Sequence, residues 1–126
     1  MKMLLYVAMG GALGASGRYA IGLIALHYTN GNFYWGTIFV NIVGSILLGV
    51  IAAIFHTAWA PSQEIQKLLI VGLLGGFTTF SAFSFEIVDL FEKDRIVFAV
   101  AYTVCSVFLS VLGLFAGLRL TRALFA

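Results

Sequence analysis

The chain is poor in charge, in cysteine and in proline, and each scarcity excludes a class of protein. Charged residues make up only 10% of its 126 residues, whereas an average soluble domain has about 25%. A single cysteine, Cys105, cannot form a disulfide framework within one chain. The two histidines, His27 and His56, have no cysteine, histidine or carboxylate partners at ligand spacing, so neither predicts a zinc site. The only proline, Pro61, lies between apolar segments and interrupts none of them.

The common catalytic and nucleotide-binding motifs are also missing. The sequence contains no nucleophile elbow, HExxH motif, P-loop or dinucleotide fingerprint. Its cationic residues are few and scattered, which argues against nucleic-acid binding. We therefore predict that the protein is not an enzyme and that it binds no nucleic acid.

What the chain has in abundance is apolar sequence. Hydrophobic residues make up 62% of it and the mean hydropathy is +1.08, which is typical of an integral membrane protein. An apolar length near 20 residues spans a bilayer as a helix. Residues 1–126 are thus predicted to form one all-α transmembrane domain of four helices with short connections, which makes sequential helices antiparallel neighbours. The predicted spans are Leu4–His27, Trp35–Phe55, Ile65–Phe91 and Ile96–Leu120. Because the first apolar pattern continues to Leu26, we expect a helix there and not a cleaved signal peptide.

Positive charge is almost evenly divided between the two predicted membrane faces. The N-terminal side carries four cations and the opposite side two or three: Lys2, Lys67, Arg119 and Arg122 against Lys93, Arg95 and, within the first span, Arg18. The positive-inside rule needs a clear asymmetry to fix an orientation. We therefore predict dual topology, with two copies of opposite orientation pairing about an axis in the membrane plane. A single, weakly biased topology with both termini in the cytoplasm is the alternative.

Three predicted helices carry a stripe of small and polar residues at helical spacing. The stripes are Gly10, Gly14, Arg18 and Gly22; then Asn41, Ser45 and Gly49; then Tyr102, Ser106, Ser110, Gly113 and Gly117. Small residues let membrane helices approach closely, so these faces should pack on protein. Packing does not explain Arg18, which we expect to point into the protein or a water-filled vestibule unless it snorkels to the interface. Asn41 either contacts a ligand or ion, or bonds across helices.

The stretch from Gly72 to Glu86 has the composition of a functional centre. Gly72, Gly75 and Gly76 are predicted to break the third helix and free carbonyl groups for a cation. Beyond them lie the hydroxyl residues Thr78, Thr79, Ser81 and Ser84, and the regularly spaced Phe77, Phe80 and Phe83. Hydroxyl donors and the positive edges of phenyl rings could line the path of a small anion, although ordinary core packing also explains phenylalanine at this spacing.

Three carboxylates follow at the end of the same helix. Glu86, Asp89 and Glu92 recur at three-residue steps. A solvated helix end at the membrane surface would explain all three, and Glu86, the deepest, is the one most apt to have a role.

These motifs resemble the Fluc/CrcB family of small fluoride channels. The resemblance covers essentially the whole chain and rests on three runs: residues 10–19 (GGALGASGRY), 36–44 (GTIFVNIVG) and 75–86 (GGFTTFSAFSFE). It implies a fluoride-selective channel that exports cytoplasmic fluoride passively through a prokaryotic inner membrane. It also implies an antiparallel, dual-topology homodimer with two pores, whose third helix is broken at mid-membrane.

The same resemblance implies roles for individual residues. The carbonyls of Gly75 and Thr78 from both copies would hold a structural sodium ion. Arg18 would line a vestibule. The fluoride path would involve Asn41, Phe80, Phe83, Ser81, Ser84, Tyr102 and Glu86.

One feature departs from the family pattern. Some relatives carry a threonine in the last helix beside the pore, whereas residues 112–115 here have no hydroxyl and Ser110 is the nearest substitute.

Two other functions are compatible with a small four-helix membrane protein. One is a dual-topology multidrug exporter, which requires a carboxylate within a span, for which Glu86 is the only candidate. The other is a structural subunit of a larger complex, against which the polar third helix argues.

Overall fold

The computed structural model describes residues 1–32 and 34–126, and all the regular elements in these ranges are helices. Position 33, in the predicted first connection, lies outside the described residues. The elements are α1 (Lys2–Tyr28), α2 (Tyr34–Thr57), α3 (Gln63–Gln66), the π-helix η1 (Lys67–Leu74), α4 (Gly75–Phe77), α5 (Ser81–Glu92) and α6 (Ile96–Phe125). The all-α prediction is confirmed, and α6 extends beyond its predicted end at Leu120.

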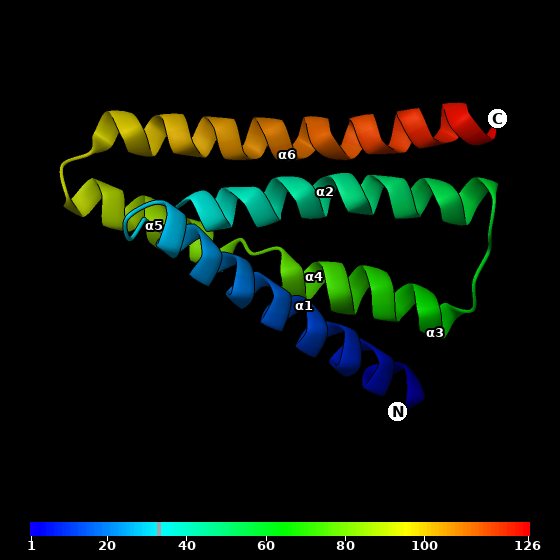
Figure 1. Cartoon of the computed structure of the whole chain (residues 1–126). Coiled ribbons are helices and arrows are strands. Elements are labelled where there is room, and N and C mark those ends of the chain that lie inside the picture. The colour runs from blue at the N-terminus through cyan, green and yellow to red at the C-terminus, as the bar shows by residue number, and fades with distance from the viewer. Residues whose placement is uncertain (33) are drawn as a thin grey trace.

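Successive segments run in opposite directions (Figure 1). The N-terminus, the connection between α2 and α3, and the C-terminus lie toward one end of the molecule. The connections that leave α1 and α5 lie toward the other end. The antiparallel order of sequential helices is therefore as predicted.

Three helical segments are long and apolar enough to cross a membrane: Tyr34–Thr57, Gln63–Glu92 and Ile96–Phe125. Their large apolar side chains are widely exposed, as at Val107, Val111 and Phe115 on α6. The chain is a multi-pass membrane protein. Helix α1 is as long as the others but is not one of these three, since Arg18 and its many glycines dilute its apolar character. The fourth span stays a prediction.

Helix α1 packs on the third segment through direct contact between backbones. Gly10 and Gly14 are buried, and a side chain at Gly14 would collide with the carbonyl of Leu73. In the reverse direction, a Cβ at Gly76 would lie 2.8 Å from the Gly11 oxygen. The predicted packing role of the Gly10–Gly14 pair is confirmed, but Gly22, in the same stripe, has open space beside it.

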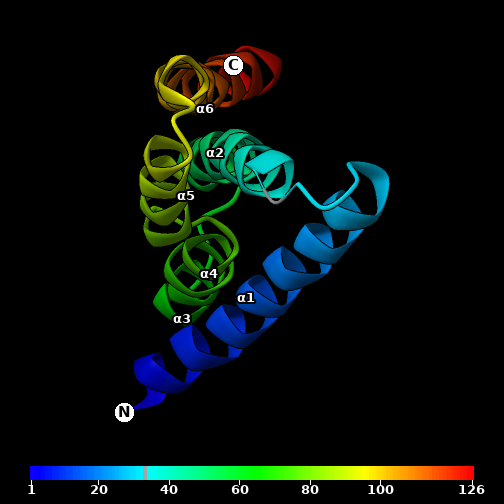
Figure 2. The same ribbon diagram turned by 90° about the vertical axis from the view of Figure 1, so that its left-hand side faces the viewer.

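Helices α2 and α6 form the second close pair and lie side by side in Figures 1 and 2. Gly49 and Gly117 are buried where the two helices meet, facing the Leu114–Leu118 and Ile46–Val50 backbones respectively. At the far end of this layer, Phe83 and Leu90 from α5 pack with Ala99 and Tyr102 from α6 in a small buried core.

The third segment is interrupted, but not where the glycines predicted. Gly72, Gly75 and Gly76 are all helical, and the Gly75 N–H still donates to the Gly72 and Ile70 carbonyls. The interruption falls between α4 and α5, over residues 78–80. Gly72 and Gly76 are glycines because the α1 backbone passes against them, with 2.7 Å from the Val7 oxygen to a Cβ built at Gly72. The prediction that these glycines break the helix was therefore wrong.

Candidate functional site

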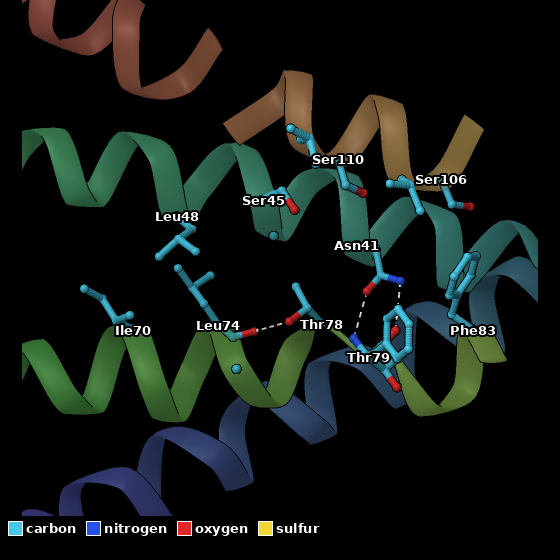
Figure 3. Close-up of a pocket in the computed structure, with 15 residues that line it drawn as sticks. Asn41, Ser45, Leu48, Ile70, Leu74, Thr78, Thr79, Phe83, Ser106 and Ser110 are labelled. Carbon is cyan, nitrogen blue, oxygen red and sulfur yellow. Dashed lines mark hydrogen bonds between the residues drawn. The ribbon is translucent and has the colours of Figure 1, made fainter. Parts of the chain in front are cut away.

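The interruption is held open by a side chain from another helix. Thr78 is extended, with φ −84° and ψ 159°. Asn41 on α2 then meets the backbone of Thr79 twice (Figure 3): its Nδ2 donates to the Thr79 oxygen at 2.9 Å, and its Oδ1 accepts from the Thr79 N–H at 2.8 Å. Asn41 bonds across helices, which was one of its two predicted roles, and it does so at the functional stretch itself.

At the interruption, two backbone N–H groups donate to side chains and not to the carbonyls that they would bond in a continuous helix. There, the Thr79 N–H would bond the Gly75 oxygen and the Ala82 N–H would bond the Thr78 oxygen. In the structure the Thr79 N–H donates to Asn41, and the Ala82 N–H donates to the Thr79 hydroxyl at 3.1 Å. Gly75 and Thr78, the residues predicted to offer carbonyls to a cation, are thus among the residues whose carbonyls lose their helical donors here.

Arg18 points toward the same interruption from α1. Its Nε donates to the Gly76 oxygen at 3.1 Å, and the side chain is partly buried. It also borders a cavity of about 170 Å³ together with Thr37, Thr79 and Glu86. Arg18 therefore contacts the third segment through its side chain. Its predicted place beside a vestibule stays a prediction.

A larger cavity of about 390 Å³ lies beside the interruption. It is bordered by α2, the third segment and α6, and Figure 3 shows side chains from all three pointing into it. Its polar lining comprises Asn41, Ser45, Thr78, Thr79, Ser106 and Ser110, and its aromatic lining Phe80 and Phe83. The cavity therefore combines the donors and ring edges expected of an anion path.

The two predicted pore phenylalanines both reach this cavity, in different surroundings. Phe80 is 76% exposed, whereas Phe83 is 5% exposed. Their ring centroids are 5.7 Å apart and the ring planes meet at 56°. The packing alternative holds for Phe83, which belongs to the buried core, but not for Phe80, whose ring has little protein around it.

Two serines of α6, Ser106 and Ser110, line the cavity. The sequence singled out both as part of a helix stripe, and Ser110 also as the nearest substitute for the threonine that some relatives carry beside the pore. The hydroxyls of Ser106 and Ser110 are buried and have no hydrogen-bond partner within the chain as described. Buried polar groups in proteins are nearly always satisfied. These two donors are therefore free to bind a ligand that reaches the cavity. Their spacing of four residues on α6 was the sequence signal that they share.

The hydroxyls of the 81–84 segment are already engaged. Ser84 Oγ donates to the Phe80 oxygen at 2.9 Å, and Ser81 Oγ lies 3.3 Å from the Thr79 hydroxyl. Neither residue borders the cavity of about 390 Å³. Their predicted place on the anion path stays a prediction.

Glu86 and Tyr102 are brought together in the interior. Glu86 is 9% exposed, and each carboxylate oxygen accepts a hydrogen bond of 2.6 Å, one from the Thr37 hydroxyl and one from the Tyr102 hydroxyl. The interpretation of Glu86 as a solvated helix end was wrong. The carboxylate instead joins α2, α5 and α6, and its position on an anion path stays a prediction.

A polar cluster of Asp89, Tyr34 and Lys93 lies at the C-terminal end of α5. Asp89 Oδ2 accepts from the Tyr34 hydroxyl at 2.6 Å and pairs with Lys93 at 2.7 Å. The hydrogen bond to Asp89 raises the pKa of Lys93 above its usual value. A cavity of about 730 Å³ borders this cluster and Glu86.

No group of three His, Cys, Asp or Glu side chains within residues 1–32 and 34–126 could hold a metal ion. Backbone carbonyls are an alternative source of oxygen ligands for a cation. Carbonyl oxygens suit hard cations, which fits the Gly75 and Thr78 pair.

The chain is similar to a known protein family and to proteins named as fluoride channels. Residues 5–118 match the family described as "CrcB-like protein, Camphor Resistance (CrcB)". A protein of Rhodospirillum centenum named "Fluoride-specific ion channel FluC" is 48% identical over 97% of each chain. Proteins with the same name from Rhizobium meliloti and from a Caulobacter species are 46% and 45% identical, over 98% and 100% of this chain and 99% of their own length. These relatives are named as channels and not as enzymes.

Proposed function

Because the chain belongs to the CrcB family, we propose that it is a fluoride-selective ion channel that lets cytoplasmic fluoride leave a prokaryotic cell passively. The relatives that carry the fluoride-channel name match nearly the full length of this chain. No coupling to another reaction is part of the proposal, since the membrane potential can drive an anion out of the cell.

The observation that carries the proposal is the pair of unpartnered hydroxyls in the cavity. Ser106 and Ser110 are buried donors without an acceptor, and they border the same cavity as Asn41 and the two phenylalanines. An ion gives up its water shell only where the protein offers substitutes. Fluoride is a small and strong acceptor, so hydroxyl donors and phenyl edges favour it over the larger, more weakly bonding chloride.

We further propose that two copies assemble antiparallel and form two pores. The near-equal charge of the two membrane faces supports insertion in both orientations. The 76% exposure of Phe80, which borders the cavity, leaves room for a second copy to complete the wall. The Glu86 carboxylate would border the path near one end, where it also borders the larger surface cavity.

The Gly75 and Thr78 carbonyls would hold a structural sodium ion at the crossing of two third segments. Support comes from the engagement of their helical donors with Asn41 and Thr79. A bound cation would supply positive charge that ties the two copies together at their carbonyls. Asn41 would hold those carbonyls outward and direct the remaining N–H of its amide toward the cavity.

One observation favours a multidrug exporter as a second candidate. Glu86 is a buried carboxylate that faces other helices, as such an exporter requires. Both of its oxygens are, however, already hydrogen-bonded by Thr37 and Tyr102. This fits a fixed structural acceptor better than a proton carrier that must release and take up a substrate.

Efflux from liposomes separates the two candidates. Purified protein is reconstituted into vesicles loaded with potassium fluoride, and valinomycin is added to allow charge balance. We expect rapid fluoride release, measured with a fluoride electrode, with no chloride release from matched vesicles and no internal pH change. Drug-driven proton exchange without fluoride release would replace the channel by the exporter.

A further inference from the structure

The Gly76 carbonyl loses its helical donor at the interruption and gains another from α1. In a continuous helix it would accept from the N–H of Phe80, but residues 78–80 leave the helical path. Arg18 Nε lies 3.1 Å from the Gly76 oxygen instead, from a residue 58 positions away in the sequence.

We propose that Arg18 is a positioning residue, whose Nε–H fixes the end of the helical run Gln63–Phe77 and thereby aims the carbonyls of the interruption. Gly76 lies directly beside Gly75 and two residues before Thr78. Holding its peptide unit therefore restrains the orientation of both neighbouring carbonyls. The link to a cation at these carbonyls rests on the proposed function, whereas the link to the backbone does not.

The physical setting favours this interaction. A cationic donor makes a stronger hydrogen bond than a neutral one, and the carboxyl end of a helical run attracts positive charge. Arg18 shares its cavity with Glu86, yet the Glu86 oxygens are bonded by Thr37 and Tyr102. The ion pairs among residues 1–32 and 34–126 are Lys2–Glu64 and Lys93–Asp89. Arg18 is therefore committed to the backbone of the interruption.

Arg18 and Asn41 hold the interruption from opposite sides. Arg18 bonds the last turn before it from α1, and Asn41 bonds Thr79 within it from α2. Side chains of two neighbouring helices thus replace the helical donor of the Gly76 carbonyl and the helical acceptor of the Thr79 N–H.

Two substitutions of equal length separate the hydrogen bond from the charge. In Arg18→Gln the amide nitrogen occupies the same position along the side chain as Nε, so the donor is kept and the charge is lost. In Arg18→Met a methyl group occupies that position, so both are lost. Arg122→Ala, at the exposed end of α6, serves as a control for general loss of cationic charge.

The first readout is amide hydrogen exchange in the 74–82 segment of the full chain in nanodiscs. We expect exchange in Arg18→Met to be about tenfold faster than in the parent chain, the change that loss of one charged hydrogen bond predicts. Arg18→Gln and Arg122→Ala should stay close to the parent. Failure of Arg18→Met to fold, while Arg18→Gln folds, would support the same role. Equal behaviour of the two, whether intact or impaired, would overturn it.

The second readout is fluoride efflux as sodium is replaced by N-methylglucamine. We expect Arg18→Met to need about tenfold more sodium for half-maximal efflux, with Arg18→Gln close to the parent. A parent chain that releases no fluoride would refute the proposed function and leave the exchange comparison standing. If both variants lose the same share of fluoride efflux, and this loss depends on ionic strength, the result would overturn the positioning role. Arg18 would then act by attracting the anion electrostatically.

Discussion

At the scale of the residue, Ser106 and Ser110 support the proposed ligand because their buried hydroxyls have no hydrogen-bond partner within the described ranges. Ser106 is only 4% exposed. A buried hydrogen-bond donor that has no acceptor lowers stability by about 1–3 kcal/mol. Two such hydroxyls on one face of α6, beside a cavity, are the donors that the proposed anion would use.

Replacing these serines by alanine should impair transport without impairing the fold. We expect Ser106→Ala combined with Ser110→Ala to lower the rate of fluoride efflux by about tenfold or more, the equivalent of one or two lost donors. The thermal midpoint should be unchanged or higher, since no internal hydrogen bond is lost. Liposome efflux and a melting curve in detergent measure the two effects.

Thr103→Ala is the matched control for this pair. Thr103 lies on the same helix, but its hydroxyl donates to the Ala99 carbonyl at 2.8 Å and does not border the cavity. It should leave efflux close to that of the parent. Normal efflux in the double serine variant would remove α6 from the anion path.

For Asn41 and Glu86, the sequence predicted that the residue matters but not which groups it contacts. A polar side chain in an apolar helix must have a partner, so both could be selected from the sequence. Their partners could not be predicted, because Thr79 lies 38 residues from Asn41, and Tyr102 lies one helix beyond Glu86. Only the packing of α2 against α5 and α6 brings these groups together.

At the scale of the helix, a glycine can have two structural effects, and the sequence does not tell them apart. It lowers helix stability, and it lets another backbone approach. The glycines of residues 72–76 suggested a weakened helix. Gly72 and Gly76 instead allow a close approach, because the α1 backbone would collide with any side chain there. The interruption instead follows from Thr78 and from Asn41, whose bonds to Thr79 compete with the helical ones.

Two glycines of α1 provide a matched test of this contact. We expect Gly14→Ala to destabilise the protein by about 1–3 kcal/mol, the range for overpacking a tight contact, because its Cβ would collide with the Leu73 carbonyl. Gly22→Ala should be neutral or slightly stabilising, since Gly22 has nothing within 4 Å of the added carbon and alanine favours the helix. Thermal unfolding in one detergent compares them.

A similar loss of stability in both glycine variants would contradict the structure. It would mean that the cost arises from a property common to the whole α1 helix and not from its contact with η1 and α4. Fluoride efflux of the two variants would then show whether the interruption depends on this contact at all.

At the scale of the whole molecule, the order of the helices was predictable and their partners were not. Apolar lengths and short connections predicted four alternating segments. The close pairs, however, are α1 with the third segment and α2 with α6, which run in the same direction within each pair (Figures 1 and 2). Small-residue stripes reveal that a face is packed, but they do not identify the helix that meets it.

The weak charge bias of the whole chain leads to a prediction about assembly. If two orientations are needed, locking the chain in one should abolish transport. Phe125→Lys with Ala126→Lys adds cations at the end that holds both termini. Glu92→Lys with Val97→Lys adds them at the opposite end, at positions that are all exposed. By the positive-inside rule, the two double variants should insert in opposite orientations.

Each locked variant should activate only one of two C-terminal reporters, one active in the cytosol and one in the periplasm, whereas the parent activates both. Each alone should fail to protect fluoride-sensitive cells, because two parallel copies cannot complete the wall beside Phe80. Expressing both together should restore protection, since they can pair antiparallel. Full protection by a single locked variant would show that one orientation suffices, and the pore would then have to be completed within copies that all point the same way.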